Sequence, residues 1–156
     1  MFGNLRELPD SLLTFFSGDD LSQKQHDAMM LLTVTDDLWP HAAMVSVGEV
    51  VAVDSTHMRL AMWPSTSTTH NLEQRGQATL VLVHDAKAYY IRLRVEPLAS
   101  NPNARHNLRR FAATIEGIRE DVAKYADLTS GIRIELKDPA SVLARWQDTI
   151  EDTLEG

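Results

Sequence analysis

Apolar positions change their spacing several times along the chain, and the first two-thirds carry mainly the spacings of β-strands. Residues 29–35 form a continuous apolar and β-branched stretch, which is typical of a strand buried on both faces. Residues 49–54 and 58–63 place valine, methionine and leucine at every second position, as half-buried strands do. The strands predicted by these patterns cover residues 29–35, 41–47, 49–54, 58–63, 77–84 and 88–99.

The last two of these strands have the strongest patterns, and Asp85-Ala86-Lys87 joins them by a connection short enough for a hairpin. Along the second strand of the pair, apolar side chains alternate with polar and charged ones. One face carries Tyr90, Arg92, Arg94 and Glu96, and the other carries Tyr89, Ile91, Leu93 and Val95. The pattern predicts a half-buried strand whose outer face is unusually cationic.

Helical patterns lie at both ends of the chain and once between the strands. Capping residues open short helices over residues 9–17 and 20–28, and a third helix over residues 70–75 stops at a glycine. After residue 103, apolar residues recur at helical spacing up to Gly117, and a short helix follows at 119–125. A final strand is predicted at 132–136, and Pro139 opens an amphipathic helix that ends near Leu154.

This order of elements predicts a mainly β (α+β) protein built on a six-stranded antiparallel split β-barrel with flanking helices. A doubly wound parallel sheet does not fit, because four strands between residues 29 and 63 leave no room for crossover helices. We expect one domain over residues 1–156. Its core barrel covers about residues 29–99, and the C-terminal helices and final strand lie in 103–154.

Composition excludes several classes of function. The 156 residues are 44% apolar and 24% charged, an ordinary globular mixture, and the formal net charge of −7 argues against nucleic-acid or anionic-membrane partners. The chain has no cysteine, which excludes disulfides and thiolate chemistry. The six histidines fall in no metal-binding spacing, and no apolar run is long enough to span a bilayer, so we expect no metal site and a cytoplasmic location.

The segment from Trp63 to Leu72 carries the clearest candidate chemistry. It runs from a strand end, through the five hydroxyl residues Ser65–Thr69, into the first turn of a helix. Free backbone N–H groups at a helix start favour an anion, and hydroxyl groups add hydrogen bonds to it. The segment therefore suits a phosphate group, and a simple helix cap is the alternative explanation of the same residues.

The chain resembles the pyridoxamine 5′-phosphate oxidase-like FMN-binding split barrels over about residues 29–99. The stretches that carry the resemblance are 31–35, 40–46, 58–63, 66–72, 78–82 and 92–96. Members of that family commonly read Ser-x-Lys-x-x-Asn-Leu after the fourth strand, and Thr66, Asn71 and Leu72 match that spacing. The order of the stretches is more specific than any one of them.

The resemblance implies a cofactor site for FMN, residue by residue. It places the phosphate near Thr66, Ser67 and Thr68, next to Asn71. It places the flavin ring and ribityl chain near a second group of residues, which are Met44, Val45, Ser46, Ala61, Met62, Trp63 and Arg92. Of these, Arg92 stands where the oxidase has a ring-contacting glutamine.

Three departures from the family pattern affect the phosphate site. Thr68 occupies the position of the phosphate-binding lysine, Ser67 that of an arginine, and Ala43 that of another arginine. Neutral partners bind a phosphate less strongly than cations do. Arg92 or Arg94 is placed to compensate, and a solvated strand face is the alternative role for both arginines.

The resulting functional hypothesis is a flavoprotein oxidoreductase, a homodimer that acts on an unknown small molecule with FMN. No residue stands out as a general acid or base, so the cofactor would carry the chemistry. Two alternatives stay open. One is a split barrel that binds a deazaflavin or haem, and the other is a non-catalytic barrel that has lost its cofactor.

Overall fold

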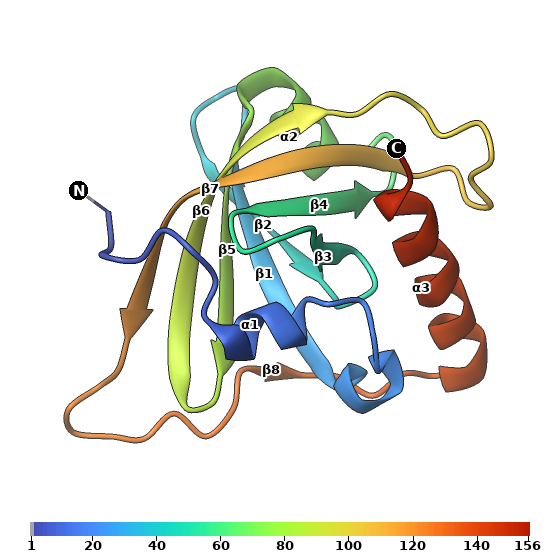
Figure 1. Ribbon diagram of the computed structural model, residues 1–156. Coiled ribbons are helices and arrows are strands. Elements are labelled where there is room, and N and C mark those ends of the chain that lie inside the picture. The colour runs from blue at the N-terminus through green and yellow to red at the C-terminus, as the bar shows by residue number, and fades with distance from the viewer. Residues whose placement is uncertain (1) are drawn as a thin grey trace.

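The computed structural model describes residues 2–156 and is dominated by one antiparallel sheet (Figure 1). Its seven strands follow the spatial order β2-β1-β5-β6-β7-β4-β3, and β8 pairs separately with β1. The strands are β1 (Asp27–Val34), β2 (Pro40–Val45), β3 (Val50–Ala52), β4 (His57–Met62), β5 (Gln77–His84), β6 (Lys87–Pro97), β7 (Arg109–Asp121) and β8 (Ile132–Arg133). The mainly β class is confirmed, and the continuous sheet has seven strands where six were predicted.

Four helical segments accompany the sheet. They are α1 (Asp10–Phe15), the 3-10 turn η1 (Leu21–Lys24), α2 (Ser67–Arg75) and α3 (Pro139–Leu154). The second predicted helix is shorter than expected, because the chain enters β1 already at Asp27. No helix among residues 2–156 is long and apolar enough to cross a membrane.

The predicted hairpin of β5 and β6 is confirmed and runs the full length of β5. Their register extends from Gln77 opposite Arg94 to His84 opposite Lys87. The two loop residues Asp85 and Ala86 both have positive φ, 50° and 63°. That pair of left-handed residues gives the connection a twist that matches the two strands.

The helices predicted at 103–117 and 119–125 are wrong, because this region contains the long strand β7. Its burial alternates, with Phe111, Ala113 and Ile115 buried in the core. β7 pairs with β6 on one edge and with β4 on the other, so its partners lie far away in the sequence. Pairing on both edges overrides the helical spacing of the alanines and apolar residues. The barrel therefore extends well beyond residue 99.

The strand predicted at 132–136 is present but reduced to the two residues of β8. The C-terminal helix α3 is confirmed, with Asp138 accepting a hydrogen bond from the Ser141 N–H at its start. At its end, the guanidinium groups of Arg59 and Arg110 donate to the carbonyl oxygens of Thr153 and Glu155. These two arginines satisfy carbonyls that the end of a helix leaves without partners.

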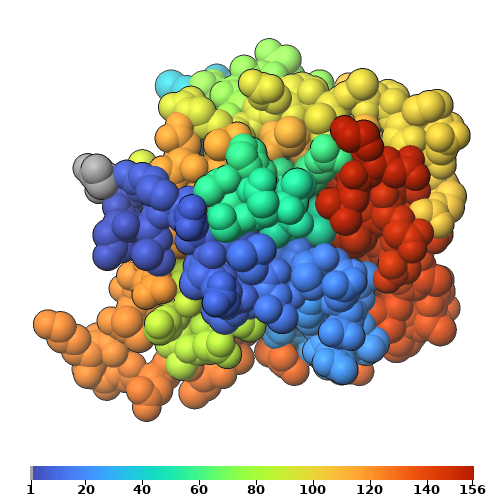
Figure 2. Space-filling model, in the orientation of Figure 1, coloured from blue at the N-terminus to red at the C-terminus, as the bar shows by residue number. Residues whose placement is uncertain are grey.

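Helix α3 lies along one end of the sheet and buries Trp146 and Ile150 (Figures 1 and 2). In Figure 2 it packs directly beside the segment that forms β3 and β4. The Trp146 indole lies over Gly48, and a Cβ atom built on that glycine would collide with the indole ring. Only glycine therefore fits at position 48 without displacing a buried aromatic side chain.

We expect Gly48→Ala to lower the free energy of unfolding by about 1–3 kcal/mol, because an added methyl group overpacks a closed core. Gly131→Ala is the matched control, since a Cβ there would meet Val83 at 3.2 Å near the surface. Chemical denaturation of both variants measures the difference. Equal stability of the two would contradict the close packing of α3 on the turn after β2.

Candidate cofactor site

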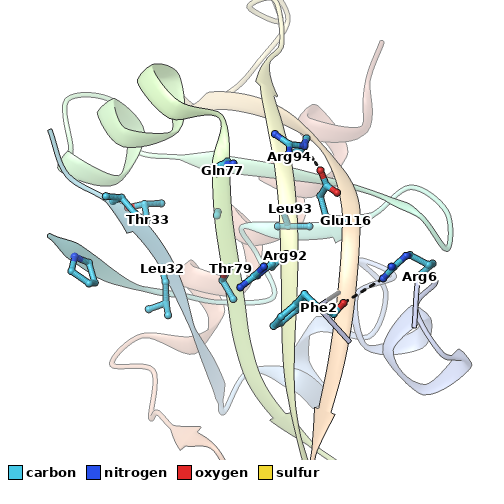
Figure 3. Close-up of a pocket in the computed structure, with 13 residues that line it drawn as sticks. Phe2, Arg6, Leu32, Thr33, Gln77, Thr79, Arg92, Leu93, Arg94 and Glu116 are labelled. Atoms are coloured by element: carbon cyan, nitrogen blue, oxygen red, sulfur yellow. Dashed lines mark hydrogen bonds and ion pairs between the residues drawn. The ribbon is translucent and has the colours of Figure 1, made fainter. Parts of the chain in front are cut away.

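A cavity of about 540 Å³ lies on the outer face of the sheet, across β1, β5 and β6 (Figure 3). Leu32, Thr79 and Arg92 are register partners on these adjacent strands, so their side chains share this face. The cavity is lined by Phe2, Arg6, Leu32, Thr33, Val34, Pro40, Gln77, Ala78, Thr79, Arg92, Leu93, Arg94 and Glu116. Its size falls in the range of small-molecule sites, about 300–1,000 Å³.

The cavity wall combines apolar side chains with arginines. Arg94 is paired with Glu116, the one carboxylate among the lining residues. The Cζ atom of Arg92 lies 4.0 Å from the centroid of the Phe2 ring, a cation–π contact. Thr79 adds a hydroxyl group beside Arg92. The arrangement suits a ligand with a flat apolar part and a negative or electron-rich edge.

A second hollow of about 520 Å³ lies at the start of α2. Thr66 is the N-cap residue, and its Oγ1 accepts a hydrogen bond of 3.1 Å from the Thr69 N–H. The residues that line it are Thr35, Asp36, Asp37, Ser65, Thr66, Ser67, His70 and Asn71. The predicted helix and its glycine stop are confirmed, but α2 begins at Ser67, three residues before the predicted start, because Thr66 caps it there.

Some of the polar side chains at this second hollow are already hydrogen-bonded to other groups of the protein. The hydroxyl groups of Thr66 and Thr69 both donate to the Trp63 carbonyl oxygen, at 3.3 Å and 2.6 Å. The His70 Nε2 lies 2.8 Å from an Asp36 carboxylate oxygen. The exposed Ser67 side chain takes part in neither contact. Hydrogen-bond donors at the first turn of α2 therefore remain available to a ligand. Asp36 and Asp37 line the same hollow, and their negative charge makes it less favourable for an anion.

A buried hydrogen bond joins the two hollows. The Asn71 side chain is only 2% exposed, and its Nδ2 donates to the Thr33 Oγ1 at 3.0 Å. Thr33 lines the cavity and Asn71 lines the hollow, and both side chains are buried, so this bond lies in the packing between β1 and α2. The two spaces meet at the end of β1, because Val34 lines the cavity and the next residue, Thr35, lines the hollow.

The structure brings together only part of the residues expected at the cofactor site. Thr66, Ser67 and Asn71 line the hollow at α2, and Arg92 lines the cavity. Thr68 is 5% exposed and lines neither space. The other six expected residues also lie outside both spaces, and they are Met44, Val45, Ser46, Ala61, Met62 and Trp63.

These six residues have varied surroundings. Val45, Ala61 and Met62 are buried in the core, whereas Met44 and Trp63 are about half exposed. The Arg145 guanidinium lies 5.6 Å from the Trp63 ring centroid. Met44 is opposite Met30 in the pairing of β1 and β2, far along the strands from Pro40 at the cavity.

Several lining residues were missed from the sequence. Thr79 could have been found, because the alternation of β5 and a hairpin with β6 place it opposite Arg92. Phe2 and Arg6 come from a segment with no periodic pattern. Their position depends on a bridge between Leu5 and Ile118, which no local signal indicates.

No protein-family model matches the chain. The uncharacterized protein YclD of Bacillus subtilis is 44% identical to it over 145 residues, which span 93% of this chain and 94% of YclD. The chain belongs to the YclD family.

Solved structures share the fold of this YclD family member at low sequence identity. A protein provisionally assigned as a pyridoxamine 5′-phosphate oxidase from Lactobacillus delbrueckii matches with a TM-score of 0.57 and 17% identity, over 74% of this chain and 95% of its own. A Listeria innocua protein with the same provisional assignment has a TM-score of 0.53 and 13% identity, over 73% and 98%. HutZ, the haem storage protein of Vibrio cholerae, has a TM-score of 0.51 and 11% identity, over 72% and 93%. The expected split-barrel fold is thereby confirmed.

Ser46, one of the expected ring-contacting residues, has a structural partner in this family member. Its N–H and hydroxyl group both donate to the Glu49 Oε1, at 3.1 Å and 2.8 Å. Burial raises the pKa of the Glu49 carboxyl, and the hydrogen bonds from Ser46 and the charge of Arg145 oppose that rise. Ser46 thus holds the Glu49 carboxylate at the turn after β2, where burial makes its charged form less favourable.

We expect Glu49→Gln to change how stability depends on pH. A pKa raised in the folded state means that the group stabilises the fold below its ordinary value of 4.5, and that this stabilisation is lost as pH rises through the folded value. The wild type should therefore lose stability relative to Glu49→Gln as pH increases from about 4. Urea denaturation over a pH series measures this, with the exposed Glu7→Gln as a control for the lost charge. Parallel curves for wild type and Glu49→Gln would contradict the raised pKa.

Proposed function

We propose that the chain is an FMN-binding split-barrel flavoprotein that transfers hydride or electrons between the flavin and a small molecule. The observation that supports this proposal is a pair of hollows that meet at the end of β1, where Val34 lines one and Thr35 lines the other. One offers hydrogen-bond donors at a helix start, and the other offers apolar walls with an arginine. Together they match a cofactor that has a phosphate at one end and a planar ring at the other.

The phosphate is assigned to Thr66, Ser67 and Thr68, beside Asn71. The first turn of α2 leaves backbone N–H groups without helical partners, and the helix dipole adds positive potential there. Thr68 contributes through its backbone, because its side chain is buried. The donor set fits a phosphate, although Asp36 and Asp37 make the fit weaker than a site with cations.

The ring is assigned to the cavity beside Arg92, with a second subunit completing the site. In one chain, Met44–Ser46 and Ala61–Trp63 lie away from the cavity. Met44 and Trp63 are half exposed, so as ring contacts they would come from a partner copy, whereas Val45, Ser46, Ala61 and Met62 are buried and are not assigned to the ring. The outer face of β1 and β2 supports a homodimer, because Val34 and Met44 are 39% and 56% exposed. Both side chains lie on the same face of the paired strands, and exposed apolar side chains are what a subunit interface would bury.

FMN would supply the redox chemistry, by accepting and returning a hydride equivalent. The chain's own residues would bind and orient it. Donors at α2 would hold the phosphate, and Leu32 and Pro40 would exclude water from the ring beside Arg92. No side chain at either hollow is assigned as a general acid or base.

A barrel without a cofactor is the second candidate. Asp36 and Asp37, beside the hydroxyl run, favour this candidate, because their negative charges repel a phosphate. The visible spectrum of the purified protein and a titration with FMN separate the two. Flavin absorbance, or saturable uptake at micromolar FMN, supports the first candidate. A colourless protein with no uptake and no increase in melting temperature would leave the second.

The position of the phosphate can be tested separately with Ser67→Glu. A carboxylate in the first turn of a helix stabilises that helix, so the variant should fold, but its charge would repel a phosphate bound there. We expect FMN affinity to fall about tenfold or more, and affinity for riboflavin, which has no phosphate, to stay unchanged. Fluorescence titration of both flavins measures this.

The neutral variant Ser67→Gln is the control for added side-chain bulk. It should bind FMN within about threefold of the wild type, since it introduces no charge. If Ser67→Glu and Ser67→Gln bind FMN equally, the phosphate lies away from α2. If both flavins weaken together in Ser67→Glu, the substitution disturbs the site as a whole.

A further inference from the structure

The N-terminal segment Phe2–Arg6 lies along β7 and forms one wall of the cavity (Figure 3). The Leu5 N–H donates to the Ile118 carbonyl oxygen at 3.4 Å, and the Ile118 N–H donates back at 2.9 Å. A Cβ atom built on Gly117 would lie 2.7 Å from the Phe2 carbonyl oxygen. Gly117 is the register partner of Arg92, so the missing side chain leaves room for the segment directly beside that arginine.

Phe2 holds the Arg92 side chain without using its hydrogen-bonding capacity. The Arg92 Cζ lies 4.0 Å from the Phe2 ring centroid, and the Arg6 Nη1 donates to the Phe2 carbonyl oxygen at 3.4 Å. A ring in contact with the face of a guanidinium group leaves the N–H groups along its edges free. Within residues 2–156, the Arg92 side chain donates to no protein acceptor.

The cavity around Arg92 has more positive than negative side chains. Glu116 is already paired with Arg94, and neither Arg6 nor Arg92 has an ion-pair partner in the described part of the chain. The chain as a whole carries a net charge of −7, so this cavity is a local exception. Clefts that concentrate one sign of charge attract ligands of the opposite sign.

We propose that Arg92, positioned by Phe2 and assisted by Arg6, binds the carboxylate of a planar aromatic carboxylic acid in this cavity. A guanidinium edge matches a carboxylate with two parallel hydrogen bonds. Leu32, Val34 and Pro40 line the cavity with apolar surface for the ring. The proposal names the ligand class of the site described above, and it rests on the proposed function only in assigning that ligand as the substrate.

Binding of benzoate to the full chain tests the subsite. Benzamide has the same ring without the charge, and cyclohexanecarboxylate has the charge without a planar ring. We expect benzoate to bind with a millimolar dissociation constant, about tenfold or more tighter than benzamide and measurably tighter than cyclohexanecarboxylate. Ligand-observed NMR titration measures all three, in the protein as purified and again after saturation with FMN.

Variants at two arginines on the same strand separate a specific site from general positive charge. Arg92→Gln should weaken benzoate binding about tenfold, because it removes the free guanidinium edge. Arg94→Gln should change it less than about threefold, because that cation is already neutralised by Glu116. Both side chains are exposed, so neither variant is expected to unfold the protein.

Phe2 is a positioning residue in this proposal, and aromatic rescue tests that role. Phe2→Ala should weaken benzoate binding several-fold, and Phe2→Trp should restore it, because the indole ring also stacks on a guanidinium group. Gly117→Ala should reproduce the loss, since its Cβ would displace the Phe2 backbone. A merely structural role for Phe2 would not distinguish tryptophan from alanine.

Three results would overturn the proposal. The first is an equal loss of benzoate affinity in Arg92→Gln and Arg94→Gln, and the second is equal affinity of the wild type for benzoate and benzamide. The third is displacement of benzoate by FMN, together with a loss of affinity for FMN but not for riboflavin in Arg92→Gln. The last result would mean that Arg92 holds the cofactor's phosphate. If FMN fails to bind while benzoate binding still depends on Arg92, the proposed function fails and the subsite stands.

Discussion

Pairing of β7 on both of its edges is the constraint on which the rest of the structure depends. One edge pairs with β6 from Ala88 to Pro97, and the other pairs with β4 from His57 to Met62. In the sheet order, β7 alone connects the β3–β4 pair to the strands that carry the cavity. The register shifts between Arg92 and Leu93, which leaves Glu116 as an extra residue on β7. Glu116 can then pair with Arg94, and Arg92 faces Gly117 and remains free.

This constraint also explains which parts of the fold the sequence could predict. The strands from β1 to β6 pair with near neighbours or alternate clearly, and α3 has a proline start and an apolar face, so local patterns locate all of them. The residues of β7 contain alanines and apolar side chains at helical spacing, and their partners on β4 lie as far away in the sequence as His57 is from Thr114. Local patterns carry no information about such partners.

The candidate site also contains residues that local sequence patterns predict and residues that depend on distant contacts. The hydroxyl run was located correctly at the start of α2, because capping is a local interaction between Thr66 and Thr69. The cationic face of β6 was also visible, because alternation places Arg92 and Arg94 together. The wall formed by Phe2 was not predictable, since it depends on the N-terminal segment finding Ile118 and on the space left at Gly117. Neither the Leu5–Ile118 bridge nor the space at Gly117 produces a periodic pattern in the sequence.

The distribution of charge between the two hollows gives them different chemistry. At α2, neutral donors stand beside Asp36 and Asp37, and the side chain at position 68 is buried, so a lysine there would have to leave the helix packing to reach a ligand. Around Arg92, cations stand beside apolar walls. Hydrogen bonds from neutral groups orient a ligand but discriminate weakly by charge, whereas an unpaired guanidinium group discriminates strongly. In the proposed function, selection of an anion would therefore depend on β6 and the N-terminal segment more than on the hydroxyl run.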